Sequence, residues 1–309
     1  MVMDKESAEL MSGLRALLAP GLYDLPVADL RARLSPPHRG PALPVAEVRD
    51  ISIDGPAGPL RLRLFRPTGG LLPGLLWLRG GWFVLGSLEH SDHLYRELAL
   101  RTGCLLVAVD FRSAPEHPYP AAIEDCTAAL AWVNAHADEL GCDPTRIAVG
   151  GDSSGGTLAA ALCQVARDRG LHPPALQLLV YPFARLRVTN PEYKDLPVFP
   201  AEAAERFWAL YCTPEQRDNP YVSPGCASEL HTLPPAVVLT AEYDCTRDDA
   251  EEYAHRLAQA GVRTTLRRCE GSFHGFLGLT AVLTSASAAM DDIAIEVRRI
   301  LGLDHLAQR

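Results

Sequence analysis

Short apolar runs alternate with longer amphipathic segments through most of the chain. The runs contain almost no polar residue, which is typical of strands that are buried on both faces of a sheet. They cover residues 75–78, 105–109, 147–149, 176–180 and 237–239, and a further strand-like run covers 264–269. Helical patterns are expected between most of the runs, over 92–102, 121–138, 155–168 and 248–260. This alternation predicts a mainly parallel sheet that is covered by helices on both sides.

The start of the chain has a different pattern. Residues 48–53 and 60–65 alternate between apolar and polar positions around a Gly-Pro turn, which predicts an antiparallel pair that opens the sheet. The first 45 residues contain two short amphipathic helices, over 4–18 and 26–34, with turn-forming residues after each. The apolar faces of these helices are too small for the helices to be stable alone, so we expect them to pack against the larger remainder of the protein.

Residues 183–233 interrupt the alternation. They follow an expected strand, are rich in proline and contain no convincing strand of their own. One helix is expected over 201–211, and it carries Phe207, Trp208 and Tyr211. An insertion of this size in an α/β fold is often a lid or a substrate-binding region, and the alternative is a surface excursion without a role.

Composition narrows the classes of protein that remain. The 309 residues carry a formal net charge of −9, with 48% hydrophobic and 22% charged residues. These values are typical of a globular protein, and the excess of acid argues against nucleic acid as a partner. The eight cysteines include no CxxC pair, so zinc and thioredoxin-like sites have no support. Because neither a signal-peptide pattern nor a membrane-spanning apolar run is found, a cytoplasmic protein with reduced thiols is the default expectation.

A candidate nucleophile follows the apolar run at 147–149. The sequence over 151–155 is Gly-Asp-Ser-Ser-Gly, and an alanine-rich helical pattern comes next. This is the G-x-S-x-G pattern in a strand–turn–helix context, where the two glycines allow the sharp turn. Ser153 then lies above a helix N-terminus, whose partial positive charge favours an oxyanion. The alternative is a phosphate-binding turn, but the chain has no G-K-[ST] motif here and Asp152 would repel a phosphate.

A serine hydroxyl needs a base to take its proton, and the base needs an acid to orient it. His274 is the expected base, because it follows the last strand-like run and has glycines on both sides. Asp244 is the expected acid at the end of the preceding strand, and Asp248 and Asp249 compete with it. The order Ser153, Asp244, His274 is the order expected of α/β-hydrolases.

Backbone N–H groups must then stabilise the oxyanion of a tetrahedral intermediate. One is expected from Ser154, directly after the nucleophile. The others are expected from the glycine-rich loop after the run at 75–78, which contains Gly80, Gly81 and Trp82.

These motifs together closely resemble the hormone-sensitive-lipase family of α/β-hydrolase carboxylesterases. The resemblance extends from about residue 48 to residue 301 and rests on several long motifs. They are G-G-W-F-V-L-G-S at 80–87, D-F-R-S-A-P-E-H-P-Y-P-A-A at 110–122, R-I-A-V-G-G-D-S-S-G-G at 146–156, A-E-Y-D at 241–244 and H-G-F at 274–276.

The resemblance implies an α/β-hydrolase fold, with an eight-stranded and mostly parallel sheet, in a single domain over residues 1–309. Residues 46–182 and 234–303 would form the catalytic core. Residues 1–45 and 183–233 would form a helical cap.

The reaction that the resemblance implies is hydrolysis of short to medium acyl esters through an acyl-enzyme. Ser153, Asp244 and His274 would be the catalytic triad. No metal and no organic cofactor is implied, the expected partner is a small-molecule ester, and a homodimer stays open.

The oxyanion loop departs from the family pattern H-G-G-G-[FW]. Arg79 stands where the family has histidine, and the family's donors would map to the N–H groups of Gly81, Trp82 and Ser154. Trp82 adds a large indole beside the reacting carbon, and a positive φ at this residue would be costly. One hypothesis is that Arg79 braces the loop by donating to carbonyls, and the alternative is that it binds a substrate carboxylate.

Aromatic side chains are predicted to wall the substrate pocket, and the alternative is that they pack the cap against the core. They are Trp82, Phe83, Phe207, Trp208 and Phe276. The altered loop keeps a second hypothesis open, in which the triad acts on one specific metabolite as a lactonase, amidase, deacetylase, acyl transferase or cyclase. A third hypothesis is a non-catalytic ligand-binding protein, which the complete triad disfavours.

Overall fold

One eight-stranded sheet forms the centre of the computed structural model, which describes residues 3–17, 21–37, 40–193, 195–196, 198 and 200–303. The strands are β1 (Glu47–Gly55), β2 (Gly58–Arg66), β3 (Leu72–Leu78), β4 (Leu105–Val109), β5 (Cys142–Asp152), β6 (Gln177–Val180), β7 (Ala236–Tyr243) and β8 (Thr264–Phe273). Their spatial order is β1-β2-β4-β3-β5-β6-β7-β8. β2 pairs antiparallel with β1 and with β4, and the other pairs are parallel. The predicted eight-stranded, mostly parallel sheet is therefore confirmed.

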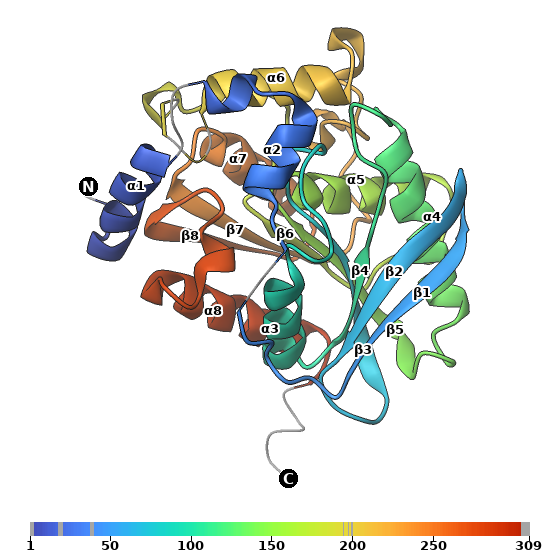
Figure 1. Cartoon of the computed structure of the whole chain (residues 1–309). Helices are drawn as coiled ribbons and strands as arrows, with labels where there is room; N and C mark the ends of the chain where they lie inside the picture. Colours follow the sequence, from blue (N-terminus) through green and yellow to red (C-terminus); the bar gives the residue numbers. More distant parts are fainter. Residues whose placement is uncertain are drawn as a thin grey trace.

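Helices cover both faces of this sheet (Figure 1). They are α1 (Lys5–Leu17), α2 (Val27–Leu34), α3 (Asp92–Thr102), α4 (Ala121–Ala135), α5 (Ser154–Asp168), α6 (Ala201–Tyr211), α7 (Arg247–Gln259) and α8 (Thr284–Ile300). On β3, Leu76 and Leu78 pack in the apolar cluster that contains α4, α5 and α7. Leu75 and Trp77 pack in the cluster that contains α3 and α8. Because both faces of β3 are buried, the strand has to be apolar at every position.

The expected elements agree with the observed ones in place, and several of them differ at their ends. The helix expected over 92–102 is α3 without a shift, whereas the helix expected over 121–138 ends at Ala135. β5 begins at Cys142 and not at 147, because Cys142 pairs with Leu72 across a register shift. The helix expected over 4–18 is α1 as far as Leu17, while residue 18 and Pro20 lie outside the described residues.

The parallel strands all point to the same edge of the sheet, and the candidate residues follow directly at their carboxyl ends. Arg79 follows β3, and Ser153 follows β5. Asp244 follows β7, and His274 follows β8. The topology thus brings together side chains that are far apart in the sequence.

The N-terminal segment and the insertion meet beyond this edge, where Figure 1 shows α2 beside α6. The Tyr23 ring lies edge-on to the Phe207 ring, with centroids 6.3 Å apart. Arg206 on α6 donates from Nη2 to the carbonyl oxygen of Leu25 over 2.8 Å. The two segments therefore contact each other.

Candidate active site

The turn between β5 and α5 holds Ser153 in a left-handed conformation. Its φ is 55° and its ψ is −124°, a region that costs a non-glycine residue about 1–3 kcal/mol. The turn is tight enough that a Cβ at Gly151 would overlap the backbone of Gly155, and one at Gly155 would overlap the carbonyl of Leu78. The N–H of Ser153 donates to the Val180 carbonyl over 2.8 Å. The strained serine is thus held by its neighbours on both sides.

Ser153, His274 and Asp244 form one hydrogen-bonded chain. His274 Nε2 lies 2.9 Å from Ser153 Oγ, and His274 Nδ1 lies 2.6 Å from Asp244 Oδ2. All three side chains are buried. A carboxylate can only accept from Nδ1–H, which leaves Nε2 as an acceptor for the serine proton.

The second oxygen of Asp244 is also occupied. Asp244 Oδ1 accepts from the N–H and from the hydroxyl of Thr246, each over 2.9 Å. These two donors fix the rotation of the carboxylate and keep Oδ2 aimed at His274. This role of Thr246 was not predicted from the sequence.

The two competing acids face other partners. Asp249 pairs with Arg185, accepting from its backbone N–H and, over 3.2 Å, from its side chain. Asp248 accepts from Asn190 Nδ2 over 2.6 Å. Of the three acids, Asp244 is the one in contact with His274.

Two aromatic rings and a carboxylate hold the segment that carries His274. The ring centroid of Tyr181 lies 4.8 Å from that of His274, and Phe183 stacks on His274 at 5.7 Å. The buried carboxylate of Glu242 accepts from the N–H of Gly271 over 2.7 Å. The sequence pattern did not single out these residues, although Tyr181 directly follows β6 and Phe183 comes two residues later, at the edge where the other site residues gather.

The oxyanion loop is strained at two successive positions. Trp82 has a φ of 61° and Phe83 a φ of 64°, so both non-glycine residues are left-handed. The N–H of Gly80 donates to Asp152 Oδ1 over 3.1 Å. Gly80 was expected among the oxyanion donors. Its N–H instead attaches the loop to the turn between β5 and α5. Burial raises the pKa of Asp152 above its ordinary value.

The side chain of Arg79 passes Gly86 and reaches the segment after β4. Its Nη2 donates to the Phe111 carbonyl over 3.2 Å and to the Ser113 hydroxyl over 2.7 Å. The guanidinium carbon lies 3.9 Å from the centre of the Phe111 ring. The side chain is buried, which lowers the pKa of its guanidinium.

Four of the five aromatic residues predicted for the substrate pocket come together. Trp82 stacks on Phe207 with centroids 5.0 Å apart, and Trp208 meets Phe183 at 5.9 Å, which in turn lies 6.3 Å from Phe83. Phe276 does not join them. It packs with α8 in the other apolar cluster, where it contacts Tyr181.

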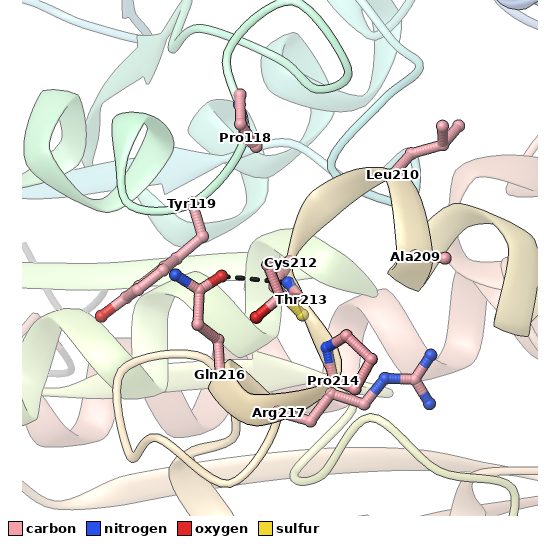
Figure 2. A pocket seen from close by; sticks show the side chains of 9 residues that line it. All are labelled: Pro118, Tyr119, Ala209, Leu210, Cys212, Thr213, Pro214, Gln216 and Arg217. Atoms are coloured by element: carbon pink, nitrogen blue, oxygen red, sulfur yellow. Dashed lines mark hydrogen bonds between the residues drawn. The ribbon is translucent and has the colours of Figure 1, made fainter.

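A separate pocket of about 580 Å³ opens at the C-terminal end of α6 (Figure 2). It is lined by Pro118, Tyr119, Ala209, Leu210, Cys212, Thr213, Pro214, Gln216 and Arg217. No residue of the hydrogen-bonded chain Ser153–His274–Asp244 lines it. Between the pocket and the oxyanion loop stands the Tyr211 ring, which stacks on Phe83 at 3.8 Å and meets Tyr119 edge-on at 6.2 Å.

Within the described part of the chain, no group of three His, Cys, Asp or Glu side chains is arranged to hold a metal ion. None of the helices in those same ranges is both long and apolar enough to cross a membrane.

Comparison with known proteins places this site in a family. Residues 75–278 match the family model described as alpha/beta hydrolase fold. The chain is 40% identical to the esterase LipI of Mycobacterium tuberculosis over 284 residues, which are 89% of each chain. It is 38% identical over 272 residues to the carboxylesterase NlhH of the same species, covering 85% of this chain and 84% of NlhH.

A solved structure is similar along nearly the whole chain. The hyperthermophilic esterase from the archaeon Pyrobaculum calidifontis superposes with a TM-score of 0.88 and is 36% identical, covering 97% of this chain and 99% of its own. Since the family model matches more than half of the chain and the relatives exceed 30% identity over most of it, this protein belongs to the α/β-hydrolase-fold family, alongside the hormone-sensitive-lipase-like carboxylesterases.

Proposed function

We propose that the protein is a serine carboxylesterase that hydrolyses short to medium acyl esters. The observation that carries the proposal is the continuous hydrogen-bonded chain from Ser153 Oγ through His274 to Asp244. Relatives named as esterases and carboxylesterases support the same activity.

In the first half-reaction, Ser153 Oγ attacks the ester carbonyl while His274 Nε2 takes the hydroxyl proton. The tetrahedral intermediate then collapses, and His274 returns the proton to the leaving alcohol. In the second half-reaction, His274 removes a proton from water, which attacks the acyl-enzyme and releases the acid. Asp244 stays ionised throughout and stabilises the imidazolium.

The oxyanion donors in this proposal are the N–H groups of Gly81, Trp82 and Ser154. Ser154 is the first residue of α5, so its N–H has no partner within the helix. Gly80 serves the hole indirectly, because its N–H ties the loop to Asp152, next to the nucleophile.

We include a substrate pocket beside Ser153 and a cap over it in this proposal. Trp82 and Phe83 would line the acyl side, with Phe207 and Trp208 above them, and Phe276 is left out of the pocket because it packs on the opposite face. The N-terminal 45 residues and the insertion over 183–233 would act as one cap on a single-domain core.

We further propose that Arg79 braces the oxyanion loop. Its hydrogen bonds and its ring contact all involve the segment Phe111–Ser113, and its side chain is buried among them. Substituting Arg79→His and measuring neutral and carboxylated esters tests this. A brace predicts equal losses on both, whereas a loss confined to carboxylated esters would show that Arg79 binds the substrate.

We propose a cytoplasmic location. All eight cysteines, which lie in the described ranges, are free thiols, and this supports the proposal.

Hydrolysis of p-nitrophenyl acetate and butyrate by the wild-type protein and by Ser153→Ala tests the main proposal. The wild type is expected to be active and the variant to retain only background hydrolysis. Equal rates would overturn the general esterase activity. Labelling of Ser153 by a fluorophosphonate without ester turnover would redirect the proposal to a dedicated acyl hydrolase or acyl transferase.

A further inference from the structure

We propose that α2 belongs to the catalytic apparatus, because Arg31 on this helix positions the oxyanion loop. The inference rests on the proposed esterase function, since it is that chemistry which needs the loop. It assigns to the N-terminal segment a role in the rate of the reaction and not only in covering the core.

Arg31 ties the loop to the neighbouring segment. Its Nε donates to the Val84 carbonyl over 2.9 Å, and its Nη2 donates to the Ala114 carbonyl over 2.9 Å. Ala114 in turn donates from its N–H to the Phe83 carbonyl over 3.0 Å. One guanidinium therefore joins α2, the oxyanion loop and the segment after β4.

The end of α2 holds the loop a second time. The Ser35 hydroxyl accepts from the N–H of Gly86 over 2.9 Å. Ser35 itself is fixed at the C-terminal end of the helix, where its N–H donates to the Arg31 carbonyl over 3.0 Å. The two contacts move together because they come from one helical turn.

Arg31 is itself held in place. Its Nη1 and Nη2 donate to the two carboxylate oxygens of Glu116 over 2.8 Å and 2.7 Å, a bidentate pair that orients the planar guanidinium. The same pair lowers the pKa of Glu116 to about 2. A lysine ammonium in this position has no fork with which to reach both carbonyls and the carboxylate.

The loop needs such contacts because two of its residues have strained backbone conformations. Left-handed φ values at two successive non-glycine residues, Trp82 and Phe83, persist only where the surroundings over-determine them. The contacts occur on both sides of this pair: Asp152 holds Gly80 on one side, and α2 holds Val84 and Gly86 on the other. Without Arg31, Trp82 and its N–H donor are free to relax away from the oxyanion position.

The test compares Arg31→Met with Arg206→Met. Arg206 also donates to a backbone carbonyl of the N-terminal segment, that of Leu25, but it makes no hydrogen bond to the oxyanion loop. Arg31→Met is expected to lower kcat on p-nitrophenyl butyrate by about 10- to 100-fold, with KM changed by less than about 3-fold. Arg206→Met, measured below its unfolding temperature, is expected to keep kcat within about 3-fold.

Two further measurements keep the test decisive. Ser35→Ala is a milder change on the same helical turn and is expected to lower kcat by about 3- to 10-fold. This variant replaces Arg31→Met as the test if Arg31→Met does not fold. In a Trp82→Gly background, glycine relieves the strain at one of the two left-handed positions while Phe83 keeps its own, so the effect of Arg31→Met on kcat is expected to be smaller than in the wild-type background.

The rate of Ser153 phosphonylation by a fluorophosphonate separates this inference from the proposed function. Phosphonylation uses the same N–H donors but cleaves a P–F bond and no carboxylic ester. Its rate is expected to fall in Arg31→Met as kcat does. If Arg31→Met loses thermal stability as Arg206→Met does, yet keeps its kcat and phosphonylation rate, the inference is overturned and the esterase proposal stands. If esters are not hydrolysed but phosphonylation still depends on Arg31, the esterase proposal fails and the positioning role stands.

Discussion

Replacing Asp244 by asparagine should trap His274 in the form that cannot act as a base. Thr246 makes this outcome specific to the present site. Its N–H is a donor only, so the side-chain oxygen of an asparagine at 244 has to face it. The amide NH₂ group then faces His274 Nδ1, which must accept. The imidazole proton moves to Nε2, where it opposes the hydroxyl of Ser153.

The size of the effect follows from this tautomer. An aspartate-to-asparagine change that leaves the geometry intact but enforces the wrong tautomer lowers kcat by about 10⁴-fold, which corresponds to about 5.5 kcal/mol of activation free energy. Asp244→Ala removes the orienting group without enforcing either tautomer. We therefore expect Asp244→Asn to be at least as slow as Asp244→Ala, although it is the more conservative change.

The assay is the kcat for p-nitrophenyl butyrate, with thermal unfolding as a check on folding. Asp248→Asn is the matched control, because the same change is made on a nearby acid that bonds to Asn190 and not to His274. It should change kcat by less than about 3-fold. A loss of less than about 10-fold in folded Asp244→Asn would refute the assignment of Asp244 and the role given to Thr246.

Three other predictions concern the loop, the nucleophile turn and the N-terminal segment. Trp82→Gly removes the indole that stacks on Phe207 and should shift the preference of the enzyme towards longer acyl chains, and unchanged relative rates on p-nitrophenyl acetate, butyrate and octanoate would exclude Trp82 from the acyl pocket. Gly155→Ala should destabilise the protein by more than about 4 kcal/mol in denaturant unfolding, because its Cβ overlaps the Leu78 carbonyl, whereas Gly13→Ala, in an open helical position, should stabilise it by up to about 1 kcal/mol. Equal effects of the two alanines would contradict the packing described. Glu116→Gln should lower the melting temperature at neutral pH, and its difference from wild type should fade as the pH falls from about 4.5 towards about 2, because the stabilising pair with Arg31 is complete above the ordinary pKa of the carboxylate and is lost through the lowered pKa of the folded state. A difference that grows with acid would have the wrong sign.

Much of the site follows from sequence because it needs only short-range rules. Buried parallel strands must be apolar throughout, so the ends of β5 and β7 could be located and Ser153 and Asp244 placed at them. β8 is a partly exposed edge strand that carries Arg267 and Arg268, so His274 was located from its flanking glycines after a strand-like run. The helix α8 was not identified, although its buried residues recur with helical spacing. Three of those residues, Ala286, Ala289 and Ala294, are small and make a weak apolar stripe.

Other features of the site depend on side-chain contacts that the pattern of apolar and polar residues does not show. The partner of Gly80 is the side chain of Asp152, and the partner of Asp244 Oδ1 is a threonine two residues along. The first contact forms only when the two loops fold against each other, whereas the second is local to one turn, which the Asp-Cys-Thr sequence permits but does not require. The separation of Phe276 from the other aromatic residues is of the same kind, because Phe276 follows the turn at Gly275 and is directed to the opposite face of the sheet.

Backbone lies against backbone where the first turn of α5 passes the end of β3. No side chain stands between Gly155 and Leu78, and Leu78 directly precedes the oxyanion loop. The distance between the turn that carries Ser153 and the start of the oxyanion loop is therefore set by main-chain thickness and not by the size of any side chain. Within the loop, Gly80 and Gly81 are fixed for a similar reason, because a Cβ on either would overlap Asp152 or the Leu85 carbonyl. The side chains of Trp82 and Phe83 point to no such backbone contact and can vary in size. Substitutions of Trp82 and Phe83 can therefore change which acyl groups fit, while the position of the loop relative to Ser153 stays the same.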